Sequence, residues 1–186
     1  MHSLHSRLLL AASLVLAGFL GATGLALDKA FRVSAEAATQ DRLQSYIYAL
    51  LAAAEEDETG HMIPPRELPE PRFSTPDSGL YAVITSHDSK VLWQSRSLTG
   101  RDLGVAEQQA PGERRFNPLA RAGMQLYALA FGVAWEDDTG TEALYTFTVA
   151  EETTVFQAEI DSFRSTLWGW LGGMAVVLLL AQGVIL

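Results

Sequence analysis

The chain changes character within one stretch, residues 79–95, which reads GLYAVITSHDSKVLWQS. Two short runs rich in β-branched and aromatic residues, 80–85 and 90–95, flank a polar segment at 86–89. Such runs, separated by a short polar turn, are typical of a β-hairpin. The stretch therefore predicts two antiparallel strands.

The same pattern returns further along the chain. The runs QLYALAFGVAW (125–135) and EALYTFTVA (142–150) flank the polar segment EDDTGT. Phe116 begins one further short strand in this interpretation. We therefore expect an antiparallel sheet of four or five strands.

Helical periodicity flanks the predicted sheet on both sides. A helix is expected at about 31–56, with one apolar stripe made of Leu43, Ile47, Leu50, Leu51 and Ala54. Near Glu151 the helical pattern returns, and it carries a second apolar seam of Phe156, Ile160, Phe163 and Leu167. The predicted fold class is α+β, an antiparallel sheet with long N- and C-terminal helices. The seam either packs against the first helix or a second copy, as a signalling element, or simply covers the sheet.

Two stretches without a charged residue, 8–27 and 167–186, lie outside this region. Each would form a helix of about 30 Å, which matches the hydrocarbon core of a bilayer. The alternative for the first stretch is a cleaved signal peptide, with Arg7 before it and small residues at 24–26. A signal peptide has an apolar core of about 7–15 residues, which is shorter than this stretch, so we expect an uncleaved membrane anchor.

The charge distribution predicts an orientation. All 22 acidic residues lie between Asp28 and Asp161, and the first seven residues carry Arg7 and no acid. By the positive-inside rule we expect a cytoplasmic tail at 1–7, a span at 8–27, a periplasmic domain at 28–166 and a second span at 167–186. The predicted location is the bacterial inner membrane.

Catalytic signals are nearly absent from the sequence, and no phosphate-binding loop or phosphoacceptor histidine context is present. Two acidic clusters remain: Glu55, Glu56, Asp57 and Glu58 at a predicted helix end, and Glu136, Asp137 and Asp138 in a predicted turn. Carboxylates of this kind suit weak binding of Ca²⁺ or Mg²⁺, and the alternative is a solvated charged edge. Gln182 in the second span serves either an interhelical hydrogen bond or signalling. The glycine pair at 169 and 173 is a candidate helix contact.

The chain resembles the N-terminal sensor region of PhoQ-like transmembrane sensor histidine kinases of Gram-negative bacteria. The resemblance lies in RLLLAASLVLAGFLGATGLALDKAF (7–31), the hairpin at 79–95, and the segments PGERRF, FGVAWE, FTVAEE and LWGWLGGMAVVLLL. It implies a homodimeric receptor with a PDC-like periplasmic domain. It also implies a HAMP linker and an ATP-binding kinase domain beyond residue 186. The family senses divalent cations through a dense acidic surface, whereas the acidic residues of this chain are dispersed, so the resemblance does not carry cation sensing over to it.

The predicted function is therefore the input region of a two-component system, which passes an envelope stimulus through the second span to a kinase and a response regulator. The alternatives are another two-span receptor, such as a chemoreceptor or a cyclic-dinucleotide enzyme, or a membrane-tethered binding domain. No catalytic residue and no bound cofactor are expected within these 186 residues. ATP belongs to the expected kinase domain, and no nucleic-acid partner is expected.

Overall fold

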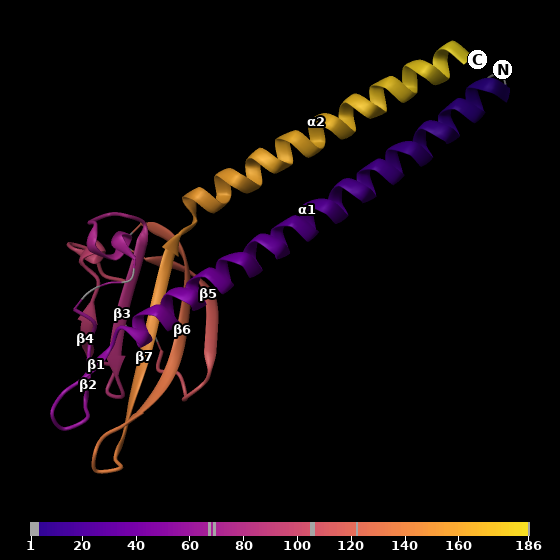
Figure 1. The fold of residues 1–186 in the computed structure, drawn as a ribbon. Helices are drawn as coiled ribbons and strands as arrows, with labels where there is room; N and C mark the ends of the chain where they lie inside the picture. Colours follow the sequence, from indigo (N-terminus) through magenta and orange to yellow (C-terminus); the bar gives the residue numbers. More distant parts are fainter. Residues whose placement is uncertain (1–3, 67, 69, 105–106, 122, 186) are drawn as a thin grey trace. The chain divides into compact units, whose positions relative to one another are not determined.

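The computed structural model describes residues 4–66, 68, 70–104, 107–121 and 123–185, with the side chains of 4–10, 154–159 and 182–185 excepted. Two long helices and seven strands are present in this part of the chain (Figure 1), so the predicted α+β class is confirmed. The helices are α1 (Leu4–Ala52) and α2 (Thr153–Ile185), with 3₁₀ turns η1 (Pro71–Ser74) and η2 (Arg96–Leu98). The strands are β1 (Glu55–Glu56), β2 (Met62–Ile63), β3 (Leu80–Ser86), β4 (Val91–Gln94), β5 (Arg114–Arg121), β6 (Met124–Glu136) and β7 (Glu142–Glu152).

The chain forms two compact units. The helical unit comprises residues 1–36 and 155–186, and the sheet unit comprises residues 37–154. The division falls within both long helices, so the last third of α1 belongs to the sheet unit.

The sheet unit contains a five-stranded antiparallel sheet with the order β4-β3-β7-β6-β5. Both predicted hairpins are present: Val83 pairs with Gln94 in the first, and Glu136 pairs with Glu142 next to the turn of the second. Phe116 lies in β5, which is longer than the short strand expected there. The pairing of the inner strands β3 and β7 places the first hairpin beside the second, although the two hairpins are far apart along the chain.

One face of this sheet is covered by the last part of α1. Leu43, Ile47 and Leu50 on the predicted stripe are at most 1% exposed and join the core with Leu80 and Phe147. Leu51 and Ala54, at the margin of the stripe, are partly buried against the same core. The 3.6-residue period of the helix and the two-residue period of the strands thus meet along one apolar layer.

The opposite face is covered by the segment that follows β4. Leu98 and Leu103 from this segment pack with Tyr81, Val83 and Ala150 in a second core cluster. Because both faces are covered, β3 is buried at six consecutive positions. This explains why its sequence is a continuous apolar run rather than an alternating one.

The two helices of the helical unit contact each other at several levels. The ring of Phe163 stacks on that of Phe31 with centroids 4.0 Å apart, and Arg164 Nε lies 2.9 Å from Asp28 Oδ1. The segments Ala11–Ala52 and Ile160–Ala181 are long and apolar enough to cross a membrane by length and composition.

The first helix ends earlier than the sequence predicts. We expected helix to Glu56, but α1 ends at Ala52 and Glu55–Glu56 forms strand β1, paired with β2. Four consecutive acids oppose the negative end of a helix dipole, which disfavours helix at these positions. The prediction that this cluster sits at a helix end was wrong, since it lies in a hairpin.

Candidate functional site

The turn between β1 and β2 is organised by one carboxylate. Asp57 Oδ1 accepts hydrogen bonds from the backbone N–H of Thr59 (2.8 Å), the backbone N–H of His61 (2.9 Å) and the hydroxyl of Thr59 (2.7 Å). Gly60 has a φ of 80°, a left-handed conformation that glycine adopts without a steric penalty. The sequence DETGH therefore specifies this turn locally.

The turn between β6 and β7 repeats the same arrangement. Asp137 Oδ1 accepts from the backbone N–H of Thr139 (2.8 Å), the backbone N–H of Thr141 (2.9 Å) and the hydroxyl of Thr139 (2.7 Å). Gly140 takes the left-handed position, with a φ of 79°. Both turns thus share an Asp, a Thr two residues later and a Gly three residues later.

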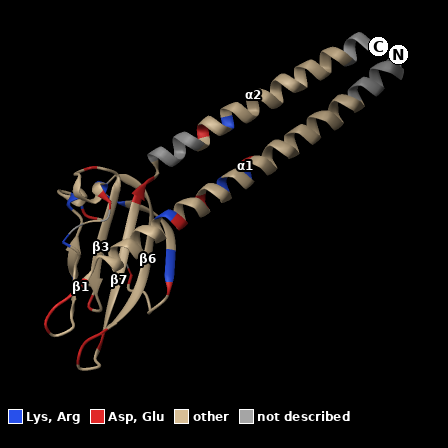
Figure 2. Cartoon of the chain, viewed as in Figure 1, with Lys and Arg blue, Asp and Glu red and all other residues tan. Residues whose placement is uncertain are grey.

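The two turns touch each other. Trp135 Nε1 donates a hydrogen bond of 3.2 Å to the carbonyl oxygen of Gly60, and His61 Nε2 lies 3.9 Å from Asp137 Oδ2. A Cβ atom on Gly60 would lie only 2.7 Å from the backbone nitrogen of Asp138. The two acidic clusters therefore meet at one end of the sheet, where Figure 2 shows acidic residues on both hairpin loops. We call this surface the paired acidic turns.

Hydrogen bonding favours the charged form of both organising carboxylates. The pKa of Asp57 is lowered chiefly by the hydroxyl of Thr59, with help from the backbone N–H groups of His61 and Thr59. The pKa of Asp137 is lowered chiefly by the hydroxyl of Thr139, and then by the backbone N–H of Thr141. Both turns therefore carry their negative charge throughout the neutral and mildly acidic range.

The arrangement is a charged surface rather than a coordination cage. Within the described part of the chain, no three acidic or histidine side chains converge as metal ligands. One oxygen of Asp57 and one of Asp137 are each already engaged by three donors. The structure places the predicted cation-binding residues in the two turns and the strand ends beside them, without a preorganised ligand set among the described side chains. They are Glu55, Glu56, Asp57, Glu58, Glu136, Asp137 and Asp138.

The predicted signalling seam of α2 faces α1 at Phe163, whose ring stacks on Phe31. Ile160 is buried and Leu167 is half-buried. The side chains of Phe156 and Gln182 lie outside the described residues. A Cβ on Gly169 or Gly173 would meet no atom within 4 Å, so this glycine pair is no contact face between the two helices.

Gly24 takes that role instead. A Cβ at this position would lie 2.9 Å from both Leu171 Cδ1 and Trp168 Cη2. Sequence reasoning treated this residue only as part of a possible cleavage site. A small residue within the first apolar stretch could have indicated this close contact between the two helices.

Glu151, at the end of β7, is a second residue that sequence reasoning missed. Its Oε2 accepts from Arg42 Nε (3.0 Å) and Nη2 (2.7 Å), and its Oε1 accepts from Arg72 Nη1 (2.8 Å). Burial opposes the charged form of Arg72, but the bond to Glu151 outweighs it and the pKa of Arg72 is raised. We call these three residues the Glu151 clamp. It fixes α1 and the η1 segment to the strand that leads into α2.

Comparison with known proteins gives one informative relative. The chain is 27% identical over 177 residues to the two-component sensor PhoQ of Pseudomonas aeruginosa, an alignment that covers 95% of this chain and 39% of that protein. No protein-family model matches the chain, and no solved structure does. The resemblance to a PhoQ-like sensor region is confirmed, and the chain spans 39% of the length of this relative.

Proposed function

We propose that the chain is the signal-input region of a two-component sensor histidine kinase. The similarity to PhoQ over 95% of the chain carries this proposal. The architecture supports it, because a sheet unit bounded in sequence by two long apolar helices suits a receptor that detects a signal on one side of a membrane. In this proposal the sheet unit is a PDC-like sensor domain. The kinase, its ATP and its response regulator belong to a cytoplasmic part outside these residues.

The two long helices are proposed to cross the inner membrane, with the sheet unit in the periplasm. Large apolar side chains on them are exposed, among them Leu14 (64%), Phe19 (68%) and Trp170 (74%). A contiguous apolar surface of this kind is unfavourable in water, and the hydrocarbon core of a bilayer would cover it. The orientation rests on the positive-inside argument from the acidic middle region and Arg7.

Signal transmission is proposed to run from β7 into α2. Strand β7 ends at Glu152 and α2 begins at Thr153, the next residue of the chain. The hydroxyl of Thr153 donates to the carbonyl oxygen of Gln125 on β6, and the Glu151 clamp holds the strand at the same end. In this proposal a displacement of β7 is passed along the chain to α2, whose seam (Phe156, Ile160, Phe163 and Leu167) and Gln182 act within a homodimer.

A divalent cation is our proposed stimulus for the paired acidic turns. Seven predicted acids on two touching turns give a strongly negative surface, and electrostatic attraction would concentrate Mg²⁺ or Ca²⁺ there. Because no three ligands converge among the described side chains, we expect weak binding through water molecules. The competing explanation is that these acids are simply solvated and bind no cation. If that explanation holds, replacing Asp138 by Asn and Glu58 by Gln leaves signalling unchanged.

The central experiment joins residues 1–186 to the cytoplasmic part of the Pseudomonas relative and measures autophosphorylation in membranes with labelled ATP. We expect labelling of the fusion and none of the present chain alone. We also expect Phe163→Ala to change the basal level of labelling, with the exposed Ser165→Ala as the matched control. A fusion whose labelling responds to no envelope condition and to no seam substitution would contradict the proposal.

A chemoreceptor or cyclic-dinucleotide output is the second candidate for the same input architecture. The coding sequence that follows Leu186 distinguishes these outputs, because each requires a different cytoplasmic domain. A phosphoacceptor helix and nucleotide-binding domain would support the kinase, and a methyl-accepting or cyclase domain would exclude it.

A further inference from the structure

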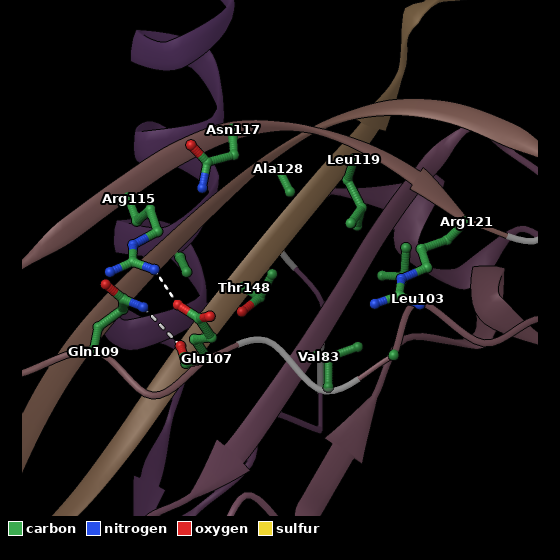
Figure 3. Close-up of a pocket in the computed structure, with 12 residues that line it drawn as sticks. Val83, Leu103, Glu107, Gln109, Arg115, Asn117, Leu119, Arg121, Ala128 and Thr148 are labelled. Atoms are coloured by element: carbon green, nitrogen blue, oxygen red, sulfur yellow. Dashed lines mark hydrogen bonds and ion pairs between the residues drawn. The ribbon is translucent and has the colours of Figure 1, made fainter.

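Ion pairs occur in both compact units, and their exposure to solvent differs. In the sheet unit, Arg115 Nη1 pairs with Glu107 Oε2 at the rim of a pocket of about 130 Å³, which Thr148 also lines (Figure 3). The side chains of this pair are 51% and 78% exposed, so solvent screens their attraction. In the helical unit, Arg164 of α2 lies beside Asp28 of α1, whose side chain is only 16% exposed. The pair between the helices is therefore the better protected of the two.

This pair lies within a row of contacts between the two helices. In order along α1, the contacts are Gly24 with Trp168, Asp28 with Arg164, and Phe31 with Phe163. The partner numbers fall along α2 as they rise along α1, so the two helices run antiparallel. The three α1 positions are four and three residues apart and share one face of that helix. Asp28 thus places a charge in a contact that is otherwise formed by a glycine and aromatic rings.

The two oxygens of Asp28 interact with two different arginines. Its Oδ1 lies 2.9 Å from Arg164 Nε on the other helix, and its Oδ2 lies 4.0 Å from Arg32 Nη2, one turn further along the same helix. A partner on the same helix moves with Asp28 and cannot fix the position of α2. The pair of Asp28 with Arg164 therefore acts on the position of α2 along the axis of α1, which we call the axial register.

The sequence places this pair at the boundary of both uncharged stretches. Asp28 directly follows the stretch 8–27, and Arg164 is the last charged residue before the stretch 167–186. If these stretches cross a bilayer, the pair lies where the hydrocarbon core meets water. Attraction between opposite charges is stronger next to such a low-dielectric region than in bulk water.

Neighbouring registers lack a favourable partner for Arg164. A shift of α2 by one helical turn is a movement of about 5.4 Å. In one direction it would bring Arg164 beside Arg32, where like charges repel. In the other direction it would bring Arg164 beside Gly24, inside the uncharged stretch, where an unpaired charge is costly. Only the observed register gives this arginine an acidic partner on the contact face.

We propose that Asp28 is a positioning residue whose ion pair with Arg164 fixes the axial register of α2 against α1. A polar group within an apolar helix contact is an established means of specifying register. The consequence for output rests on the proposed function: in the receptor, the pair holds the kinase at its resting level. Breaking the pair allows α2 to shift by one turn, which is a known form of switching.

Crosslinking of the full chain in liposomes with a short bifunctional thiol reagent measures the register. The chain has no cysteine, so Phe31→Cys can be combined with Phe163→Cys for the observed register. Combination with Ile160→Cys or Leu167→Cys reports registers shifted by about one turn. We expect the first combination to crosslink most efficiently. Asp28→Asn should reduce this preference by about threefold or more, whereas Asp28→Glu keeps the charge and should preserve most of it.

Two further variants separate the ion pair from other effects of the substitution. Arg32→Gln is the matched control, because it removes only the partner on the same helix and should leave the register unchanged. Arg164→Gln should act as Asp28→Asn does, and the two together should have no larger effect than either alone, because both remove the same pair. An unchanged register in Asp28→Asn, additive effects in the double variant, or an equal change in Arg32→Gln would each overturn the proposal.

Autophosphorylation of the fusion with the cytoplasmic part of the Pseudomonas relative tests the consequence for output. Asp28→Asn should change its basal labelling by about twofold or more, and Arg32→Gln should not. A shifted register with unchanged labelling would overturn the regulatory role of the pair. A fusion without any label contradicts the proposed function instead, because the crosslinking result requires no kinase domain. Circular dichroism of each variant identifies loss of folding.

Discussion

At the scale of single residues, the two Asp-centred turns show how local sequence sets a charge state. In each turn one carboxylate oxygen accepts three hydrogen bonds from groups within four residues of it. The folded-state pKa of each Asp therefore lies below its unfolded value. Their contribution to stability is complete above the unfolded pKa of about 3.9 and is lost as the pH falls through the lower folded value.

We predict that Thr139→Val raises the pKa of Asp137 and leaves that of Asp57 unchanged. The hydroxyl of Thr139 is the largest contributor to the lowered pKa of Asp137, and valine keeps the side-chain shape without the donor. Thr59→Val should have the converse effect on Asp57. Carbon-13 NMR titration of the aspartate carboxyl groups between about pH 2 and pH 6 measures both values. An unchanged Asp137 in the Thr139→Val variant would show that backbone donors alone set its pKa.

Position 132 on β6 requires glycine, because the backbone of another segment lies directly against it. A Cβ at this position would lie 2.2 Å from the carbonyl oxygen of Ala110 and 2.5 Å from that of Gln109. Backbone hydrogen bonds of Gly132 with Gly112 (2.9 Å) and Glu113 (3.1 Å) hold the crossing segment in place. The obstacle is backbone, so no side-chain rotation relieves the clash.

We therefore predict that Gly132→Ala destabilises the sheet unit by about 3 kcal/mol, the upper part of the usual range for overpacking. Urea denaturation followed by tryptophan fluorescence measures the free energy of unfolding. The exposed Ala134→Ser on the same strand is the control, with an expected change within about 0.5 kcal/mol. If both variants unfold alike, the segment at 109–111 does not lie against β6 as described.

At the scale of elements, the contact between α1 and α2 depends on Gly24. The chain has no cysteine, so a Phe31→Cys, Phe163→Cys double variant provides a single crosslinking pair. The stacked rings at these positions predict that a short bifunctional thiol reagent crosslinks the two cysteines within one chain. Adding Gly24→Leu should remove most of the crosslinked product, because its side chain would collide with Trp168 and Leu171.

Gly169→Leu is the matched control for this experiment, since a side chain there meets no atom within 4 Å. Denaturing gels of protein cleaved between the two helices separate crosslinked from free fragments. Crosslinking that appears only between chains would assign the seam to a dimer contact rather than to the helical unit of one chain.

The Glu151 clamp joins three elements, and we predict that Glu151→Gln destabilises the sheet unit by about 1–2 kcal/mol. Buried charge-assisted hydrogen bonds stabilise a fold by more than this amount. The side chains of Arg42 and Arg72 are 45% and 38% exposed, so solvent screens part of their interaction with Glu151. Chemical denaturation measures the change. The exposed Glu142→Gln on the same strand should be neutral, and equal stability of the two variants would show that the clamp contributes nothing to folding.

At the scale of the whole molecule, the sheet unit has its own core on both faces of the sheet. We predict that residues 37–154, produced alone, unfold in one cooperative transition. Ile47→Ala should then lower the free energy of unfolding by about 2–5 kcal/mol, because Ile47 is 1% exposed and its removal leaves a cavity. Urea titration followed by circular dichroism measures this, and the exposed Ser45→Ala is the control. An excised unit without a cooperative transition would contradict the division into two units.

The sequence by itself determined the elements whose information is local. The hairpin at 79–95, the strand pair around EDDTGT and the apolar stripe through Leu43 and Ile47 were predicted correctly, because side-chain periodicity and turn chemistry act within a few residues. The resemblance to a PhoQ-like sensor was also readable from the sequence. The end of α1 was misjudged, because the pairing of Glu55–Glu56 with Met62–Ile63 competes with helix at positions where either is possible.

Only the tertiary structure decided which distant residues meet. The two acidic clusters were visible as separate runs, but their contact depends on the docking of the β1–β2 hairpin against Trp135. Glu151 lies 109 residues from Arg42 and 79 from Arg72, and Thr148 lines its pocket only because β3, β5, β6 and β7 align in one register. Contacts between residues so far apart in sequence arise from the packing of whole elements, and no local pattern encodes them. The strands and helices could therefore be predicted from the sequence, whereas the candidate sites could be found only in the fold.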